Sequence, residues 1–120
     1  MSEIKTFRDL IAWQKAMDLA RGVYRVTRAM PETERFGLTS QMRRCAVSVP
    51  SNIAEGFGRQ STDEYIRFLK IARGSLAELD TQLELSISME LISSDAQADD
   101  LLKETDRVLQ GLIRSLERPR

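Results

Sequence analysis

The sequence predicts an all-α protein, an up-and-down antiparallel four-helix bundle, from three observations. Apolar residues recur at three- and four-residue spacing in every long segment, which is the period of an amphipathic helix. No segment shows the strict alternation of apolar and polar residues that a half-buried strand requires. The connections between segments are short, and short connections make consecutive helices antiparallel neighbours. With 120 residues, the chain has the size of a single domain, 1–120.

The first predicted helix starts behind Thr6, which is a plausible N-cap with Asp9 three residues later. It ends at Met30, because Pro31 disfavours helical geometry in the residue before it. The helix carries two neighbouring apolar stripes: Leu10, Trp13, Met17, Ala20 and Tyr24 form one, and Ala16, Leu19, Val23, Val26 and Met30 form the other. This is a wider apolar face than one helix contact needs. Core packing would explain the first stripe, but aromatic residues and methionine are also enriched in subunit interfaces. We therefore predict an oligomer interface at Trp13, Met17 and Tyr24.

The second predicted helix starts between Phe36 and Thr39 and ends at Gly56 and Gly58. It contains Pro50, which removes one backbone hydrogen bond and clashes with the preceding turn. We therefore expect this helix to be kinked or interrupted near Pro50. Two interpretations of the segment remain open: a kink whose freed carbonyls are satisfied by Ser51 or Asn52, or a polar pocket that binds something.

The third predicted helix has the clearest start, because Ser61 and Glu64 have the spacing of a capping box. Its apolar stripe predicts that it runs to about Leu91. A second capping box is predicted at 94–97, with Ser94 as its first residue, and it opens the fourth helix. Acidic residues near the start of the fourth helix and arginines near its end match the helix dipole.

The sequence lacks the residues that several kinds of catalytic and metal-binding site need. The chain has no histidine, which removes the commonest general base and most zinc sites. It has no phosphate-binding glycine motif, and its only cysteine, Cys45, cannot form a disulfide within the chain. We predict no enzyme activity, no metal and no cofactor. The polar start and the short apolar runs predict a cytoplasmic protein that does not enter a membrane.

Positive charge is concentrated in the first part of the chain. Residues 1–75 hold 13 Lys and Arg against 8 Asp and Glu, a net +5, whereas residues 76–120 hold 5 against 10, a net −5. Arginine suits phosphate, because its planar fork makes two hydrogen bonds. The candidate nucleic-acid-binding residues are Arg21, Arg25, Arg28, Arg43, Arg44, Arg59, Arg67 and Lys70. The alternative is a solvated charged face on a protein-interaction adaptor that never touches nucleic acid.

Several motifs also resemble those of a known family. They are Phe7–Leu10, Trp13–Gln14, Val23–Tyr24, Gln41–Arg44, Ser48–Gly56 and Phe68–Leu79, of which Asn-Ile-Ala-Glu-Gly at 52–56 and Ala-Arg-Gly-Ser at 72–75 are the most specific. In these the chain resembles bacterial four-helix-bundle proteins first noted in intervening sequences of 23S ribosomal RNA genes. Cys45 departs from the pattern, in which a small aliphatic residue is more usual.

The resemblance implies a homopentameric ring of bundles with no catalytic residues. A related protein, the accessory variability determinant of diversity-generating retroelements, binds a reverse transcriptase and nucleic acid through a basic surface. By this resemblance the partners are further copies of the chain and RNA or a nucleic-acid-processing protein. The shared motifs also imply packing or polar-network positions at Pro50, Asn52, Glu55, Gly56, Arg73 and Gly74.

Overall fold

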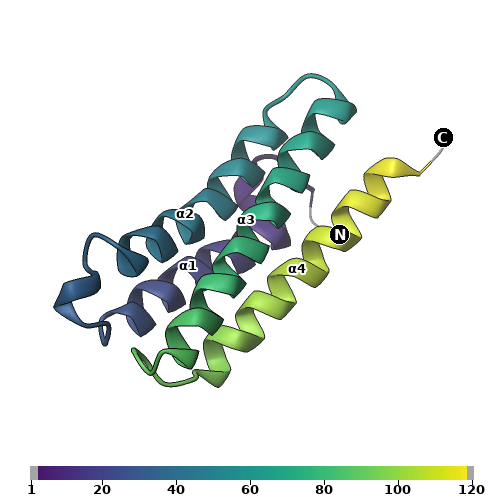
Figure 1. Cartoon of the computed structure of the whole chain (residues 1–120). Helices are drawn as coiled ribbons and strands as arrows, with labels where there is room; N and C mark the ends of the chain where they lie inside the picture. The colour runs from purple at the N-terminus through teal and green to yellow at the C-terminus, as the bar shows by residue number, and fades with distance from the viewer. Residues whose placement is uncertain (1–2, 119–120) are drawn as a thin grey trace.

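The computed structural model describes residues 3–118 and contains four helices and no strand in that range. The helices are α1 (Ile11–Thr27), α2 (Leu38–Phe57), α3 (Thr62–Ser88) and α4 (Ala96–Glu117). Two short 3-10 turns precede α1 and α2: η1 (Phe7–Asp9) and η2 (Glu32–Glu34). The helices lie side by side as an up-and-down bundle (Figure 1), so the predicted fold class is confirmed.

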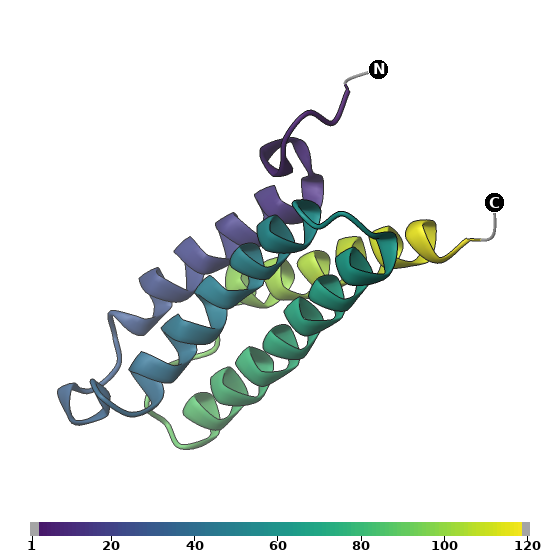
Figure 2. The same ribbon diagram turned by 90° about the horizontal axis from the view of Figure 1, so that it is seen from above.

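Each helix packs on its neighbours around one apolar core. α1 packs against α2 and α4, and α3 packs against the same two helices. The centre of the core consists of fully buried aliphatic side chains from all four helices, among them Leu19, Met42, Ile53, Leu79 and Leu109. The η2 connection and the α3–α4 connection lie at one end of the bundle, and η1 and the α2–α3 turn lie at the other (Figures 1 and 2).

The start of α1 differs from the prediction. Thr6 does form a capping box with Asp9, but this box closes the short η1 turn. Leu10 is then extended, with φ −73° and ψ 127°, so the long helix begins at Ile11. The η1 turn folds back over α1, where the rings of Phe7 and Trp13 meet edge to face at 5.3 Å between centroids.

The helix α2 runs through Pro50 without a break, so of the two predicted alternatives, a kink or an interruption, the interruption is excluded. The turn around the proline carries two side-chain hydrogen bonds to the backbone one turn earlier. Ser51 Oγ donates to the Val47 carbonyl and Asn52 Nδ2 to the Ser48 carbonyl, both at 2.8 Å. These side chains therefore bond to the carbonyls of Val47 and Ser48, whereas the carbonyl that Pro50 leaves without an amide partner is that of Ala46, one turn before it.

The connection between α3 and α4 corrects two further predicted boundaries. α3 ends at Ser88 rather than near Leu91, because Glu90 adopts a left-handed conformation with φ 61°. The amide of Leu91 then bonds to the Ser86 carbonyl, and that of Glu90 to the Ile87 carbonyl, which is the Schellman pattern. α4 is capped one residue later than predicted, because Asp95, not Ser94, accepts from the Ala98 amide at 2.9 Å.

Candidate nucleic-acid interface

Most of the predicted nucleic-acid-binding cations are occupied by acids of the same chain. Five of the eight form ion pairs at 2.9–3.4 Å: Arg21 with Asp18, Arg25 with Asp95, Arg59 with Glu55, Arg67 with Glu64, and Lys70 with Glu117. All five cations are at the surface, where such pairs contribute little to stability but lower the local positive potential. A phosphate would have to compete with these carboxylates.

Arg43 has a structural role in joining α1 to α2. Its Nε donates to Thr27 Oγ1 at 2.9 Å and its Nη2 to the Tyr24 carbonyl at 3.4 Å. The guanidinium lies over the Tyr24 ring, 4.6 Å from its centroid. The positive charge is therefore held at the carboxyl end of α1, where the helix dipole favours a cation.

Arg28 and Arg44 are left as the free cations of the predicted set. Both are exposed, and within residues 3–118 neither has a carboxylate within ion-pair distance. Arg28 follows the last residue of α1, and Arg44 lies in the second turn of α2. They are available to bind an anion without breaking an existing pair.

A shallow groove of about 510 Å³ lies along this part of the bundle. It is lined by Tyr24, Arg35, Phe36, Thr39, Ser40, Arg43, Arg44 and Val47. None of the lining residues is acidic. Phe36 is 88% exposed, the highest value among the large apolar residues in the described range, and Tyr24 and Val47 are more than 40% exposed. The groove therefore combines positive charge with one strongly exposed ring, that of Phe36, over which the Arg35 guanidinium lies 5.2 Å from the centroid.

Phe36 and Arg35 were missed by the sequence analysis. Phe36 was considered only as a possible start of the second helix, whereas it lies in the loop before α2. The one available signal was its place between two helix-breaking residues, Pro31 and Gly37, outside every apolar stripe. An aromatic residue at such a position has no core to enter.

The three predicted interface residues lie in different surroundings. Trp13 and Met17 are half-buried, and Trp13 packs against Phe7 and the core, so η1 covers this end of the stripe. Tyr24, at the other end, is 42% exposed and borders the groove. The Trp13 end of the stripe is thus covered, whereas the part from Met17 to Tyr24 is more open to another molecule.

The residues singled out by the family motifs lie on α2 and α3. Pro50 is buried, and Asn52 and Glu55 make the bonds to Ser48 and Arg59 already described. A Cβ at Gly56 would lie 2.7 Å from the Phe68 Cβ, so this glycine permits the close approach of α2 and α3. A Cβ at Gly74, in contrast, would meet no atom within 4 Å, so nothing in the single chain requires a glycine there.

Arg73 joins α3 to α4 through Asp106. Its Nε is 2.8 Å from Asp106 Oδ1 and its Nη2 is 3.3 Å from Oδ2. Burial acts to raise the pKa of the Asp106 carboxyl, but the hydrogen bonds from Arg73 and Gln110 outweigh it, so the pKa is lowered. Arg73 is therefore part of a polar network between α3 and α4.

Three further features concern metals, membranes and the cysteine. Within residues 3–118, no three histidine, cysteine or acidic residues come together as metal ligands would. None of the described helices combines the length and the apolar character needed to cross a bilayer. Burial is the main cause that raises the pKa of the Cys45 thiol, which keeps it in the less reactive protonated form.

Comparison with known proteins gives the family. A family model described as 23S rRNA-intervening sequence protein matches residues 8–114. Among solved structures, the chain is similar to a protein of unknown function from the S23 ribosomal protein family of Bacteroides thetaiotaomicron, with a TM-score of 0.73 and 24% identity over 90% of this chain and 100% of that one. No curated protein matches the sequence. With nearly the whole described bundle inside the match, the chain belongs to the 23S rRNA-intervening sequence protein family.

Proposed function

We propose that this protein is a non-catalytic, cytoplasmic homo-oligomer that binds RNA, or a ribonucleoprotein, through the groove between α1 and α2. The observation that carries the proposal is the combination of the unpaired Arg44 and the exposed Phe36 ring in a groove whose lining contains no acid. Phosphates would bind to Arg44 and, beside the groove, Arg28. An unpaired base would stack on Phe36.

The chemistry of this surface fits single-stranded regions of RNA best. Proteins recognise such regions by stacking unpaired bases on aromatic side chains and by binding the backbone with cations. A regular RNA duplex keeps its bases stacked inside, so Phe36 would find no free base face there. We therefore expect loops, bulges and ends to bind, with little preference for sequence because every base has a ring face.

Assembly would make this surface effective. One copy offers few free cations and has a net charge of zero, so its affinity for RNA would be weak. Several copies in a ring would present the groove repeatedly to one RNA, and linked sites bind far more tightly than single ones. The homopentamer implied by the family resemblance, with a contact near Met17 and Tyr24, is part of this proposal.

The test is a titration of labelled RNA hairpins with the purified protein, followed by fluorescence anisotropy at several salt concentrations. If the two free arginines neutralise about two phosphates per groove, the logarithm of the affinity should fall with the logarithm of the salt concentration with a slope of about −1.4. A hairpin with a large loop should bind better than a duplex of the same length. No binding to either RNA at low salt would reject the proposal and favour a protein-interaction adaptor.

A further inference from the structure

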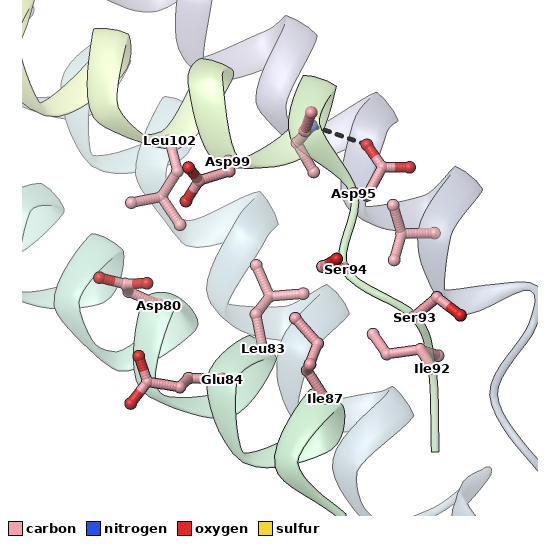
Figure 3. Close-up of a pocket in the computed structure, with 13 residues that line it drawn as sticks. Asp80, Leu83, Glu84, Ile87, Ile92, Ser93, Ser94, Asp95, Asp99 and Leu102 are labelled. Atoms are coloured by element: carbon pink, nitrogen blue, oxygen red, sulfur yellow. Dashed lines mark hydrogen bonds between the residues drawn. The ribbon is translucent and has the colours of Figure 1, made fainter. Parts of the chain in front are cut away.

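A second hollow, of about 280 Å³, lies between α3, α4 and their connection, away from the arginine groove. Its floor is apolar and is formed mainly by Leu83 and Ile87 of α3, Ile92 of the connection and Leu102 of α4. Figure 3 shows these side chains gathered between the two helices. Ile87 is 37% exposed, so part of this apolar surface is open to solvent.

The connection that closes the pocket is held in place at both ends. The left-handed residue Glu90 turns the chain sharply behind α3, and Ile92 then packs inward with 9% exposure. At the other end, Asp95 caps α4 and pairs with Arg25 of α1. The pocket is therefore formed before any ligand arrives, which reduces the entropy cost of binding.

Acidic side chains surround the apolar floor. Asp80 and Glu84 stand one turn apart on α3, and Asp99 lies on α4 (Figure 3). Asp99 is paired with Lys103, but in the described part of the chain Asp80 and Glu84 have no basic group within ion-pair distance. Like charges one turn apart on a helix repel each other. A cation placed between them would relieve that repulsion.

The pocket and the arginine groove thus favour ligands of opposite charge. The acidic rim repels phosphate, which excludes RNA here, whereas a purely cationic ligand would leave the apolar floor uncovered. A polypeptide segment supplies both parts in adjacent residues, an aliphatic or aromatic side chain for the floor and lysines or arginines for the rim. The charge pattern therefore matches a basic segment with an apolar anchor.

We propose that the pocket between α3 and α4 docks a short basic segment of a partner protein, with one apolar side chain on Leu83 and Ile87 and with cations on Asp80 and Glu84. This site uses none of the residues that we assign to RNA binding. It can therefore be tested independently of the proposed function. Together the two sites would let the protein join an RNA to a basic protein.

The test uses three fluorescein-labelled peptides with the full-length protein. The first has lysines and arginines around a central leucine, the second has serine in place of the leucine, and the third has glutamates in place of the cations. We expect the first peptide to bind most tightly, because it can make both the apolar and the ionic contacts. The second should bind more weakly, and the third should not bind. Equal binding of the first two, or binding of the third, would overturn the proposal, as would no binding of the first at low salt.

The decisive variant is Asp80→Asn/Glu84→Gln, which removes the two free charges and keeps the size of the side chains. Both positions are exposed, and circular dichroism checks that the bundle still folds. Its matched control is Glu78→Gln/Asp100→Asn, which changes the net charge equally at exposed positions outside the pocket. The first variant should bind the basic peptide about five- to twentyfold more weakly, and the control should stay within about twofold of the wild type, because salt screens distant charges.

Two outcomes of this comparison contradict the proposal. Equal weakening in both variants would mean that only the overall charge matters. Loss of self-association in the pocket variant alone, measured by light scattering without any peptide, would mean that a second copy of the chain fills the pocket. RNA binding, measured on the same samples, should be unchanged, which keeps a failure here distinct from a failure of the groove.

Discussion

The guanidinium of Arg25 holds both carboxylate oxygens of Asp95, with Nη1 2.9 Å from Oδ2 and Nη2 3.3 Å from Oδ1. The same carboxylate caps α4 through the Ala98 amide. One contact, between residues 70 positions apart, therefore fixes the end of α1 against the start of α4. The hydrogen bond from Arg25 is the main cause that lowers the pKa of Asp95 below its ordinary value of 3.8.

This lowered pKa predicts how the contact responds to acid. Because the folded-state pKa lies below the unfolded one, the contribution to stability is present in full above about pH 4 and is lost as the pH falls through the folded pKa. Asp95→Asn keeps a good capping oxygen but loses the charge. In urea unfolding, wild type should be more stable than this variant at pH 7, and the difference should shrink toward pH 3. An unchanged difference across that range would contradict the assignment.

Gly56→Ala should destabilise the bundle. The added methyl group would lie 2.7 Å from the Phe68 Cβ and 3.2 Å from the Tyr65 carbonyl oxygen, so α2 and α3 must move apart. Overpacking of this kind costs about 1–3 kcal/mol, which exceeds the gain of helix propensity from Gly to Ala. The free energy of unfolding, measured by urea titration with circular dichroism, should fall. A more stable variant would show that the helices can separate at no cost.

The same substitution at Gly74 should act in the opposite direction. The position is exposed in the middle of α3 and has open space around it, so alanine adds only helix propensity, worth about 1 kcal/mol. The free energy of unfolding should rise by about that amount. A decrease, especially one that grows with protein concentration, would instead place Gly74 in a contact between copies of the chain.

Glu90→Gly should stabilise the connection between α3 and α4. Glu90 has φ 61°, a conformation that costs a non-glycine residue about 1 kcal/mol or more and costs glycine little. The gain should appear as a higher free energy of unfolding, with Glu90→Ala, which keeps the strain, as the control. If the two variants are equally stable, the left-handed turn is not strained in the folded protein.

Local signals in the sequence predicted most of the fold. Ser61 predicted the start of α3 correctly, because a cap acts over three residues and is visible in the chain itself. The reciprocal half of the predicted capping box is not formed, because the Glu64 carboxylate bonds to Arg67. The same kind of signal failed at Thr6, because a capping box closes a 3-10 turn as well as a long helix. It also failed at the end of α3, where the left-handed residue is a glutamate rather than the expected glycine or asparagine.

The candidate site depended on contacts that the sequence does not reveal. Arg25 and Arg28 look alike in the chain, yet one is paired with an acid 70 residues away and the other is free. The helical period placed the arginines on the surface but could not separate those with carboxylate partners from those without. Phe36 was missed because a lone aromatic residue in a loop forms no periodic pattern.

The central claim is that the free arginines beside the α1–α2 groove bind RNA, and a matched pair of charge reversals tests it most directly. Arg43 is left unchanged, because its hydrogen bonds to Thr27 and Tyr24 hold α1 and α2 together. The test variant is Arg28→Glu/Arg44→Glu. The control, Arg107→Glu/Arg114→Glu, makes the same change in net charge at exposed positions on α4.

The measurement is the affinity of each variant for a labelled RNA hairpin with a large loop, by fluorescence anisotropy at low salt, with folding checked by circular dichroism. We predict that Arg28→Glu/Arg44→Glu binds at least about tenfold more weakly than wild type, and that the control stays within about threefold. Wild-type affinity in the folded Arg28→Glu/Arg44→Glu variant, or an equal loss in both variants, would contradict the assignment of RNA binding to this groove.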